Sequence, residues 1–271
     1  MSHTLVTFHA HPDDEALLTA GVMAKAADAG HRVVAVFATE GEAGEADRGQ
    51  FGAGKALRRH RRAEAEAAAS ILGVSRVVFL GFADSGSDAR TTSPPGSFST
   101  VPVEQAAARL TEVLREEQAD VLTTYDRHGG YGHPDHIQIH RVGVRAGALA
   151  GTPAVLEATV SRELLQAGVE LARSMGHDLG EGFQPDSLDA WYLPEAEITT
   201  VVDVREQLDR KRAAMRAHAS QATSEAGTVR SLEVFAGLPE DLFALAFAKE
   251  WFVRRSPAVA GTDDDLFAGL R

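Results

Sequence analysis

Short runs of β-branched and aromatic residues alternate along the chain with longer, alanine-rich stretches that have helical spacing. The runs predict strands and the stretches predict helices. The predicted strands are residues 4–10, 32–38, 76–80, 121–125, 154–160 and 198–202. The predicted helices are residues 15–29, 56–72, 103–118, 134–149, 162–175, 204–218 and 238–248. This alternation is typical of a mostly parallel sheet with helices on its faces, so we predict the α/β fold class.

Two polar segments predict loops, at residues 41–54 and 83–102. The second is rich in Pro, Gly and Ser, and a loop of its length inside a compact domain is usually functional or disordered. We find no internal repeat and no clear linker, so residues 1–255 are expected to form one domain. Residues 256–271, which include three consecutive aspartates, are expected to be a frayed tail.

The charge and the cysteine count exclude several classes of function. The 271 residues include 27 Lys and Arg against 39 Asp and Glu, which gives a formal charge of −12. An acidic chain is poorly suited to neutralising the phosphates of a nucleic acid or an anionic membrane surface. The absence of cysteine excludes disulfides, a thiol nucleophile and zinc sites that use thiolate. A metal would have to be held by His, Asp or Glu.

The first residues show neither a basic start nor a long apolar run, so they do not resemble a signal peptide. No stretch approaches the roughly 20 apolar residues of a membrane helix. We therefore expect a cytoplasmic protein, and the sequence leaves open whether it forms a homo-oligomer.

Six of the eleven histidines fall in two short windows, residues 9–11 and 128–140. Each window contains the tripeptide His-Pro-Asp where a predicted strand gives way to a helix. Ligands bind open α/β sheets at the carboxyl ends of the strands, so both windows can contribute to one crevice.

The two windows together contain the ligands of a hydrolytic zinc site. His11 and Asp14 are three residues apart across a turn, and His136 can supply a third ligand. Two His and one carboxylate with an open position allow zinc to activate a water, and Fe²⁺ or another divalent ion can take the same ligands.

The residues beside these ligands suggest the rest of the chemistry. Asp13 is placed to act as a general base towards the water. His133 can donate a proton or stabilise an oxyanion, and Asp135 can orient its imidazole and keep it protonated. Tyr131, between two glycines, can bring a phenol to the same oxygen.

A purely structural interpretation competes with this one. Acidic residues and proline are common at helix starts, so a single His-Pro-Asp would be expected to be structural. Two copies in matched contexts favour the metal site. His9 is expected to be packed in the sheet rather than functional.

The two motifs, Ala10–Glu15 and Gly130–His136, resemble those of the zinc-dependent de-N-acetylase family named for LmbE and PIG-L. Further similarities lie at Arg61 with Glu64, at Asp84–Gly86, and at 209–221, so the resemblance covers roughly residues 4–255. Within the family, the chain is similar to the mycothiol biosynthetic deacetylase and the mycothiol S-conjugate amidase.

The resemblance implies a Rossmann-like three-layer fold and the hydrolysis of an N-acyl group on an amino sugar of the N-acetylglucosamine type. It implies that His11, Asp14 and His136 hold the metal and that Asp13 is the base. Arg61 and Asp84 would contact the substrate by the same similarity, although a helix-surface arginine and a turn-forming aspartate are equally good interpretations.

The chain departs from the mycothiol enzymes at Leu18, where they have a polar residue. An apolar side chain there favours a deacetylase with a different substrate, provided that Leu18 faces the pocket and not the core. The alternatives are an amidase that cleaves a larger acyl group and a sugar-binding protein without turnover. A dinucleotide-binding function is excluded because the first predicted strand lacks the Gly-x-Gly-x-x-Gly pattern.

Overall fold

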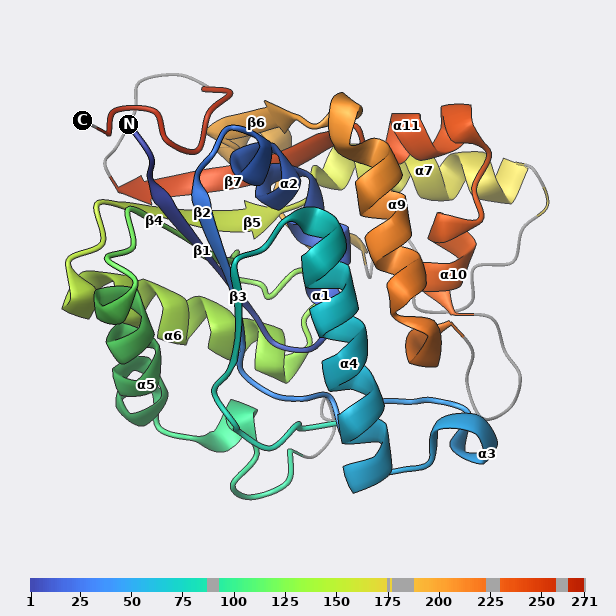
Figure 1. The fold of residues 1–271 in the computed structure, drawn as a ribbon. Helices are drawn as coiled ribbons and strands as arrows, with labels where there is room; N and C mark the ends of the chain where they lie inside the picture. The colour runs from blue at the N-terminus through green and yellow to red at the C-terminus, as the bar shows by residue number, and fades with distance from the viewer. Residues whose placement is uncertain (87–92, 175, 177–187, 223–229, 257–262, 271) are drawn as a thin grey trace.

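The computed structural model describes all residues except 87–92, 175, 177–187, 223–229, 257–262 and 271. Seven strands form one sheet in the order β3-β2-β1-β4-β5-β7-β6 (Figure 1). The strands are β1 Thr4–His9, β2 Arg32–Phe37, β3 Arg76–Phe79, β4 Val121–Tyr125, β5 Ala154–Thr159, β6 Thr200–Asp203 and β7 Lys249–Ser256. The pairs from β3 to β5 are parallel, and β7 runs antiparallel to both of its neighbours. The predicted α/β class with a mostly parallel sheet is therefore confirmed.

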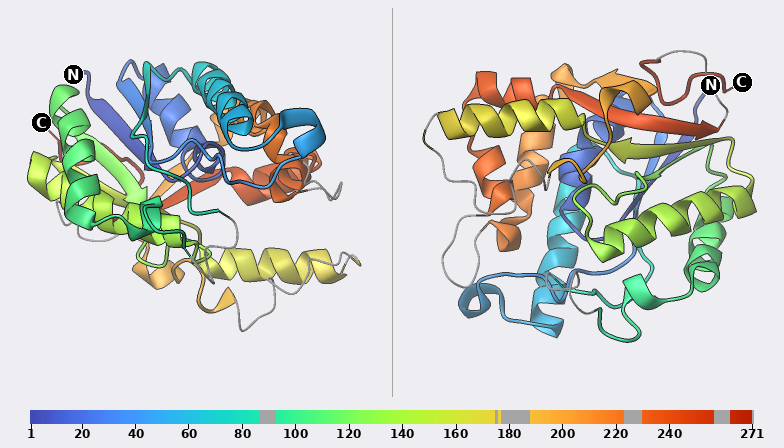
Figure 2. Two further views of the ribbon diagram at one scale, coloured as in Figure 1. Left: turned by 90° about the horizontal axis from the view of Figure 1, so that it is seen from below. Right: turned by 180° about the vertical axis from the view of Figure 1, so that it is seen from behind.

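Helices cover both faces of the sheet, which gives three layers (Figure 2). The α-helices are α1 Asp14–Leu18, α2 Ala20–Asp28, α3 Arg48–Phe51, α4 Lys55–Leu72, α5 Val103–Glu116, α6 Pro134–Ala150, α7 Arg162–Ser174, α9 Leu208–Ala217, α10 Ser231–Ala236 and α11 Glu240–Phe247. Short 3₁₀ turns lie at η2 Phe98–Thr100, η4 Glu195–Glu197, η5 Arg205–Gln207 and η6 Ala219–Gln221. Among the described residues, no helix has both the length and the apolar character needed to cross a membrane.

Alternate residues of the central strands build two separate cores. Leu5 and Val33 point to the face covered by α2, α4 and α9, while Val6 and Val34 point to the face covered by α5 and α6. Strands that are buried on both faces have few polar positions, which explains why the sequence shows them as continuous apolar runs. Burying each such side chain contributes about 1.5–3 kcal/mol.

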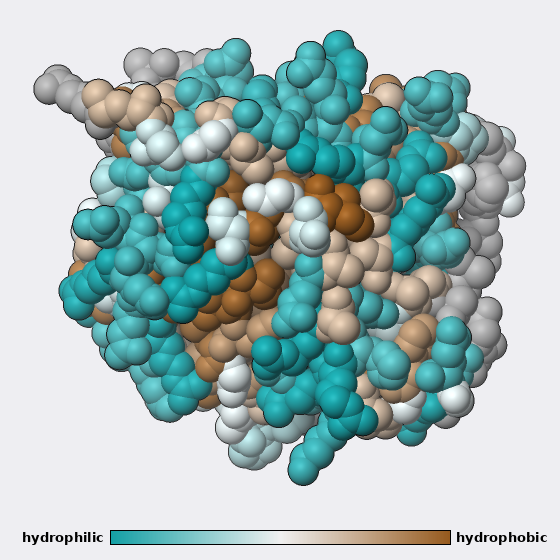
Figure 3. Space-filling model, viewed as in Figure 1, coloured by the Kyte–Doolittle hydropathy of each residue, from teal (hydrophilic) through white to brown (hydrophobic). Residues whose placement is uncertain are grey.

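The surface in Figure 3 is mostly hydrophilic, with hydrophobic side chains gathered over β3 between α4 and α5. β3 is the edge strand of the sheet, and all four of its residues are half-buried.

In the sheet, β1 lies between β2 and β4. The chain runs from β1 to β2 and β3 on one side of β1, and then crosses to β4 on the other side. This reversal of strand order creates the crevice in which open α/β sheets bind ligands, at the carboxyl ends of the two strands. The His-Pro-Asp turns follow β1 and β4, so the fold brings both motifs to this crevice.

The single helix predicted over residues 15–29 is wrong, because the chain breaks into α1 and α2 at Thr19. A buried ion pair from distant residues satisfies the two helix ends at the break. Lys211 Nζ donates to the carbonyl of Leu17 at 2.8 Å, and Glu250 accepts the N–H groups of Gly21 and Val22 at 2.8 Å each. Helix ends normally leave such groups without a partner.

Three further elements differ from the sequence expectations. α3 lies inside the segment that we expected to be a loop, and α10 and β7 were not predicted. In β7 the charged residues Glu250 and Arg254 are buried. The usual alternation of apolar buried and polar exposed residues is therefore absent from its sequence, and the strand could not be predicted. The expected frayed tail is wrong for residues 263–270: Leu266 is buried, and Asp263 bridges to Thr200.

Candidate active site

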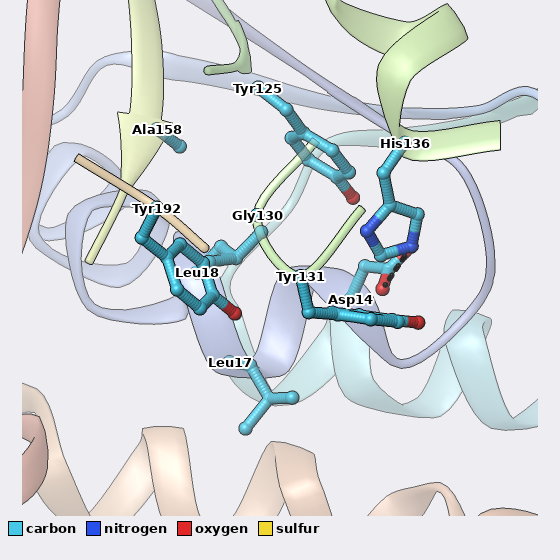
Figure 4. A pocket seen from close by; sticks show the side chains of 9 residues that line it. All are labelled: Asp14, Leu17, Leu18, Tyr125, Gly130, Tyr131, His136, Ala158 and Tyr192. Atoms are coloured by element: carbon cyan, nitrogen blue, oxygen red, sulfur yellow. Dashed lines mark ion pairs between the residues drawn. The ribbon is translucent and has the colours of Figure 1, made fainter. Parts of the chain in front are cut away.

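Among the described residues, two groups of possible metal ligands share His11 at the crevice between β1 and β4, and the second of them consists of His11, His133 and Asp135. His11, Asp14 and His136 each present a ligand atom, and these atoms lie within 4.8 Å of one another. His136 Nε2 is 3.3 Å from Asp14 Oδ1, the ion pair drawn in Figure 4, and His11 Nδ1 is 3.5 Å from Asp14 Oδ2. Both imidazoles are buried. The structure thus brings together the three residues that we expected to be metal ligands.

The other nitrogen of His11 faces two carboxylates. His11 Nε2 is 3.1 Å from Asp135 Oδ2 and 3.4 Å from Asp84 Oδ1. Burial alone would lower the pKa of His11, but Asp84 and the hydrogen bonds with Asp135 and Asp14 raise it well above its usual value. An ionised carboxylate only accepts hydrogen bonds, so Nε2–H points to Asp135 and Asp84, while Nδ1, which faces Asp14, is the nitrogen that would give up its proton to bind a metal.

The structure therefore gives Asp135 a different partner from the one we expected. Its carboxylate binds His11 and, at 2.6 Å, the hydroxyl of Ser85, whereas only its backbone N–H reaches His133, at 3.2 Å from Nδ1. The prediction that the Asp135 side chain keeps His133 protonated is wrong. Asp135 lies in the first turn of α6, where its backbone N–H is capped by His133 and its side chain points to the end of β1.

His133 is a neutral imidazole in this arrangement. Burial, followed by the positive charges of His11 and His136, lowers its pKa to about 4. Because Nδ1 accepts a hydrogen bond from the backbone, the proton is on Nε2, which donates to the carbonyl of Gly86 at 3.1 Å. His133 is thus equipped as an N–H donor towards an oxyanion.

Asp13 lies next to the cluster in a backbone conformation that is rare for a residue with a side chain. Its φ is 123°, and such a conformation costs on the order of 1–3 kcal/mol and persists only where its surroundings hold it. Glu15 Oε2 accepts its N–H at 2.9 Å, and Arg61 Nη2 lies 3.2 Å from its Oδ1. Burial raises the pKa of Asp13, while Arg61 opposes this shift. A carboxylate with a raised pKa is better suited to accepting a proton at neutral pH.

Arg61 and Asp84 both lie at the site, but their neighbours are protein groups. Arg61 is buried and donates to the carbonyls of Pro12 and Gly41. A side chain at Gly41 would collide with its guanidinium, which explains the glycine there. Asp84 accepts the N–H groups of Gly86 and Ala43. Both residues therefore support the site, and a contact with substrate stays a prediction.

An apolar wall faces the candidate metal ligands across a small pocket (Figure 4). Asp14 and His136 lie on one side, and Leu17, Leu18 and Tyr192 lie on the other. Ala158, Tyr125, Gly130 and Tyr131 complete the lining. Leu18 also packs against both hydrophobic cores. It is therefore both a residue that lines the pocket and a residue that packs against the core.

Tyr131 and Tyr192 are brought together by the glycine turn. The ring of Tyr131 lies 5.0 Å from that of His136 and 6.0 Å from that of Trp191, measured between centroids. The Tyr192 N–H donates to the carbonyl of Gly130, and its ring covers the position that a Gly130 side chain would occupy. No sequence pattern pointed to Tyr192, because it lies far along the chain in a segment without regular structure.

Two further histidines lie near the site and are buried. His9 is fully buried, as expected, between the hydroxyls of Tyr125 and Thr19, at 3.1 and 3.2 Å. Burial lowers its pKa to about 4. His218 contacts Glu15, and the sequence contained a signal for it, because it belongs to the 209–221 segment that resembles the family.

Proteins similar to this chain are known in both sequence and structure. Residues 6–147 match the family described as "PIG-L: GlcNAc-PI de-N-acetylase". The chain is 39% identical to a 1D-myo-inositol 2-acetamido-2-deoxy-alpha-D-glucopyranoside deacetylase of Thermomonospora curvata, with 97% of this chain and 95% of that protein covered. An enzyme of the same name from Acidothermus cellulolyticus is 36% identical, with 100% and 96% covered.

Solved structures with the same fold are more distant in sequence. The N,N'-diacetylchitobiose deacetylase of Pyrococcus horikoshii has a TM-score of 0.59 at 22% identity, covering 93% of this chain and 84% of that chain. GalB, a 4-carboxy-2-hydroxymuconate hydratase from a Pseudomonas strain, has a TM-score of 0.62 at 20% identity, covering 96% and 99%. Since a deacetylase and a hydratase share the fold, the fold alone does not define the reaction.

Proposed function

Because the chain belongs to the GlcNAc-PI de-N-acetylase family, we propose that it is a metal-dependent hydrolase that removes the N-acetyl group from an amino sugar of the N-acetylglucosamine type. The observation that carries this proposal is the position of Asp13 and His133 beside the cluster of His11, Asp14 and His136. A protein that only binds sugars needs neither a base nor an oxyanion donor, so this pair favours an enzyme.

The cluster fits a divalent metal ion. His136 Nε2 is buried and has no hydrogen-bond partner among the described residues, although Asp14 Oδ1 faces it at 3.3 Å. Two imidazoles and one carboxylate suit zinc, and they would also accept Fe²⁺ or another first-row ion. We propose one zinc ion per chain, which when bound would lower the pKa of a water and polarise the acyl carbonyl.

The residues of the chain then divide the reaction between them. Asp13 takes a proton from the attacking water while the new carbon–oxygen bond forms. The Nε2–H of His133 turns from Gly86 to the carbonyl oxygen, where it stabilises the developing negative charge, and the phenol of Tyr131 assists it. The carbon–nitrogen bond breaks as Asp13 returns the proton to the leaving nitrogen. The products are acetate and a free amine.

The relatives and the pocket favour two different substrates. The names of the relatives make the 1D-myo-inositol glycoside of N-acetylglucosamine the first candidate. Leu18 on the apolar wall favours a second candidate, an N-acetylated amino sugar with a less polar group at that position. In either case the substrate is a small molecule, and we place the enzyme in the cytoplasm.

The test is acetate release from a panel of compounds by zinc-reconstituted protein, with metal-free protein as the control. The panel contains the inositol glycoside, N-acetylglucosamine, N,N'-diacetylchitobiose, and N-butyryl counterparts that probe a larger acyl group. We expect zinc-dependent release from at least one N-acetyl compound. Stoichiometric zinc binding without release from any compound would contradict the proposed enzyme and favour a sugar-binding protein.

A further inference from the structure

The backbone of Asp13 needs an external support. Its φ of 123° and ψ of −29° place it where residues with a side chain are strained. Such a conformation persists only where the surrounding contacts hold it. The direction of the Asp13 carboxylate follows from this backbone, so whatever holds the backbone also aims the carboxylate.

Glu15 provides one of these contacts, and His218 holds Glu15. Glu15 Oε2 accepts the N–H of Asp13 at 2.9 Å, and Glu15 Oε1 lies 2.5 Å from His218 Nε2. Glu15 is 2% exposed and His218 is fully buried. The two oxygens of the Glu15 carboxylate thus have different partners: one binds the backbone of Asp13 and the other binds the imidazole of His218.

His218 is itself fixed in place. It lies at the carboxyl end of α9, which packs against α4, α2 and α1. Two residues later, Ser220 binds Glu64 of α4 through its N–H at 2.8 Å and its hydroxyl at 2.6 Å. The imidazole therefore approaches Glu15 from the end of a helix that packs against three others.

We propose that His218 is a positioning residue that aims the Asp13 carboxylate through Glu15. This inference rests on the proposed role of Asp13 as the base. Without a donor at His218, a buried carboxylate must rotate or recruit another partner, and the Asp13 N–H loses its fixed acceptor. The turn can then relax to a negative φ, which turns the base away from the water.

The test compares His218→Leu, which has no donor, with His218→Gln, whose amide N–H can still reach Glu15. A small misplacement of a catalytic group can cost on the order of 100-fold in rate. We expect His218→Leu to lower kcat by about 10- to 100-fold with KM changed less than about twofold and zinc stoichiometry retained. His218→Gln should restore kcat to within about threefold of the wild type.

The control for lost stability is Met215→Ala, one turn earlier in α9 and buried in the core. It should lower Tm and leave kcat unchanged at a temperature where it stays folded. If His218→Leu does not fold, His218→Asn, whose shorter amide does not reach Glu15, replaces it in the comparison with His218→Gln.

Crystal structures of the zinc-loaded wild type and His218→Leu provide a readout that does not depend on activity. We expect the Asp13 φ to be positive in the wild type and negative in the variant. The proposal would be overturned if His218→Leu had the kcat of the wild type or kept a positive φ at Asp13. It would also be overturned if a loss of zinc from the variant accounted for its loss of rate. A wild type that binds zinc but hydrolyses nothing would contradict the proposed function, while the φ comparison would still test the support by His218.

Discussion

At the scale of single residues, the proposed mechanism separates the groups that would hold a metal from the groups that would move a proton. His11, Asp14 and His136 converge on one point, while Asp13 and His133 lie beside them with other partners. A change in the second group should therefore affect turnover without affecting metal content.

Asp13→Asn tests this separation most directly. An amide of the same shape preserves the contact with Arg61 but cannot accept the proton of the water. General-base catalysis typically contributes about 10²–10⁴-fold, and we expect kcat to fall by that factor while zinc stays bound. Steady-state kinetics and elemental analysis of the same preparation measure the two quantities. Asp203→Asn, at an exposed position, is the matched control. Near wild-type turnover of Asp13→Asn would show that another group is the base.

Leu18→Ser tests the apolar wall. An apolar side chain cannot satisfy a polar substrate group, and burying such a group without a partner costs about 1–3 kcal/mol. We expect the substitution to raise kcat/KM for the inositol glycoside relative to N-acetylglucosamine by about 5- to 100-fold. Leu245→Ser, an exposed leucine, should leave the ratio unchanged. If the wild type already prefers the inositol glycoside strongly, Leu18 does not restrict the substrate.

At the scale of elements, the break between α1 and α2 sets the position of Asp14 and of the apolar wall. The break depends on Lys211 and Glu250, which are 1% and 2% exposed and lie 2.5 Å apart. Lys211 donates to a carbonyl at the end of α1, and Glu250 accepts N–H groups at the start of α2. Gly21 completes the arrangement, because a side chain there would collide with Val204.

Lys211→Met should therefore destabilise the protein strongly. Removing one partner leaves a buried charge without compensation, which typically costs about 3–5 kcal/mol. Urea unfolding should show this loss, whereas Lys25→Met, at an exposed lysine, should change the free energy of unfolding by less than about 0.5 kcal/mol. Adding Glu250→Gln to Lys211→Met should recover part of the loss, because the amide oxygen still accepts a helix N–H without a charge. A Lys211→Met variant as stable as the wild type would show that the pair does not hold the break.

At the scale of the whole molecule, a metal bound at the proposed ligands would link both halves of the sheet. His11 and Asp14 follow β1, and His136 follows β4. A ligand that binds only the folded state stabilises it by about 2.7 kcal/mol at 100 times its Kd. We expect zinc to raise the Tm of metal-free protein by roughly 5–10 °C at that concentration. The His11→Ala, His136→Ala double variant should show no such rise, and full zinc occupancy of that variant would contradict the ligand assignment.

The central strands and the positions of the two His-Pro-Asp turns could be predicted from the sequence, because both depend on local pattern. The buried strands appear as apolar runs, and each His-Pro-Asp marks a turn after a strand. The break at Thr19, the strand β7 and the partner of Asp135 were missed because they depend on contacts between distant residues. Lys211 and Glu250 are polar residues that look solvent-exposed in the sequence, and only the tertiary structure shows that they are buried.

The same distant contacts have a consequence for the order in which the chain acquires its shape. Glu250 binds residues about 230 positions earlier, and His218 binds Glu15 across 203 positions. A chain leaves the ribosome from its N-terminus at about 5–20 residues per second, so the first helix would wait on the order of ten seconds or more for the last strand. During that interval the first motif is already synthesised, but its backbone lacks the supports described above. A nascent chain would therefore remain catalytically silent at least until His218 and Glu250 have been synthesised.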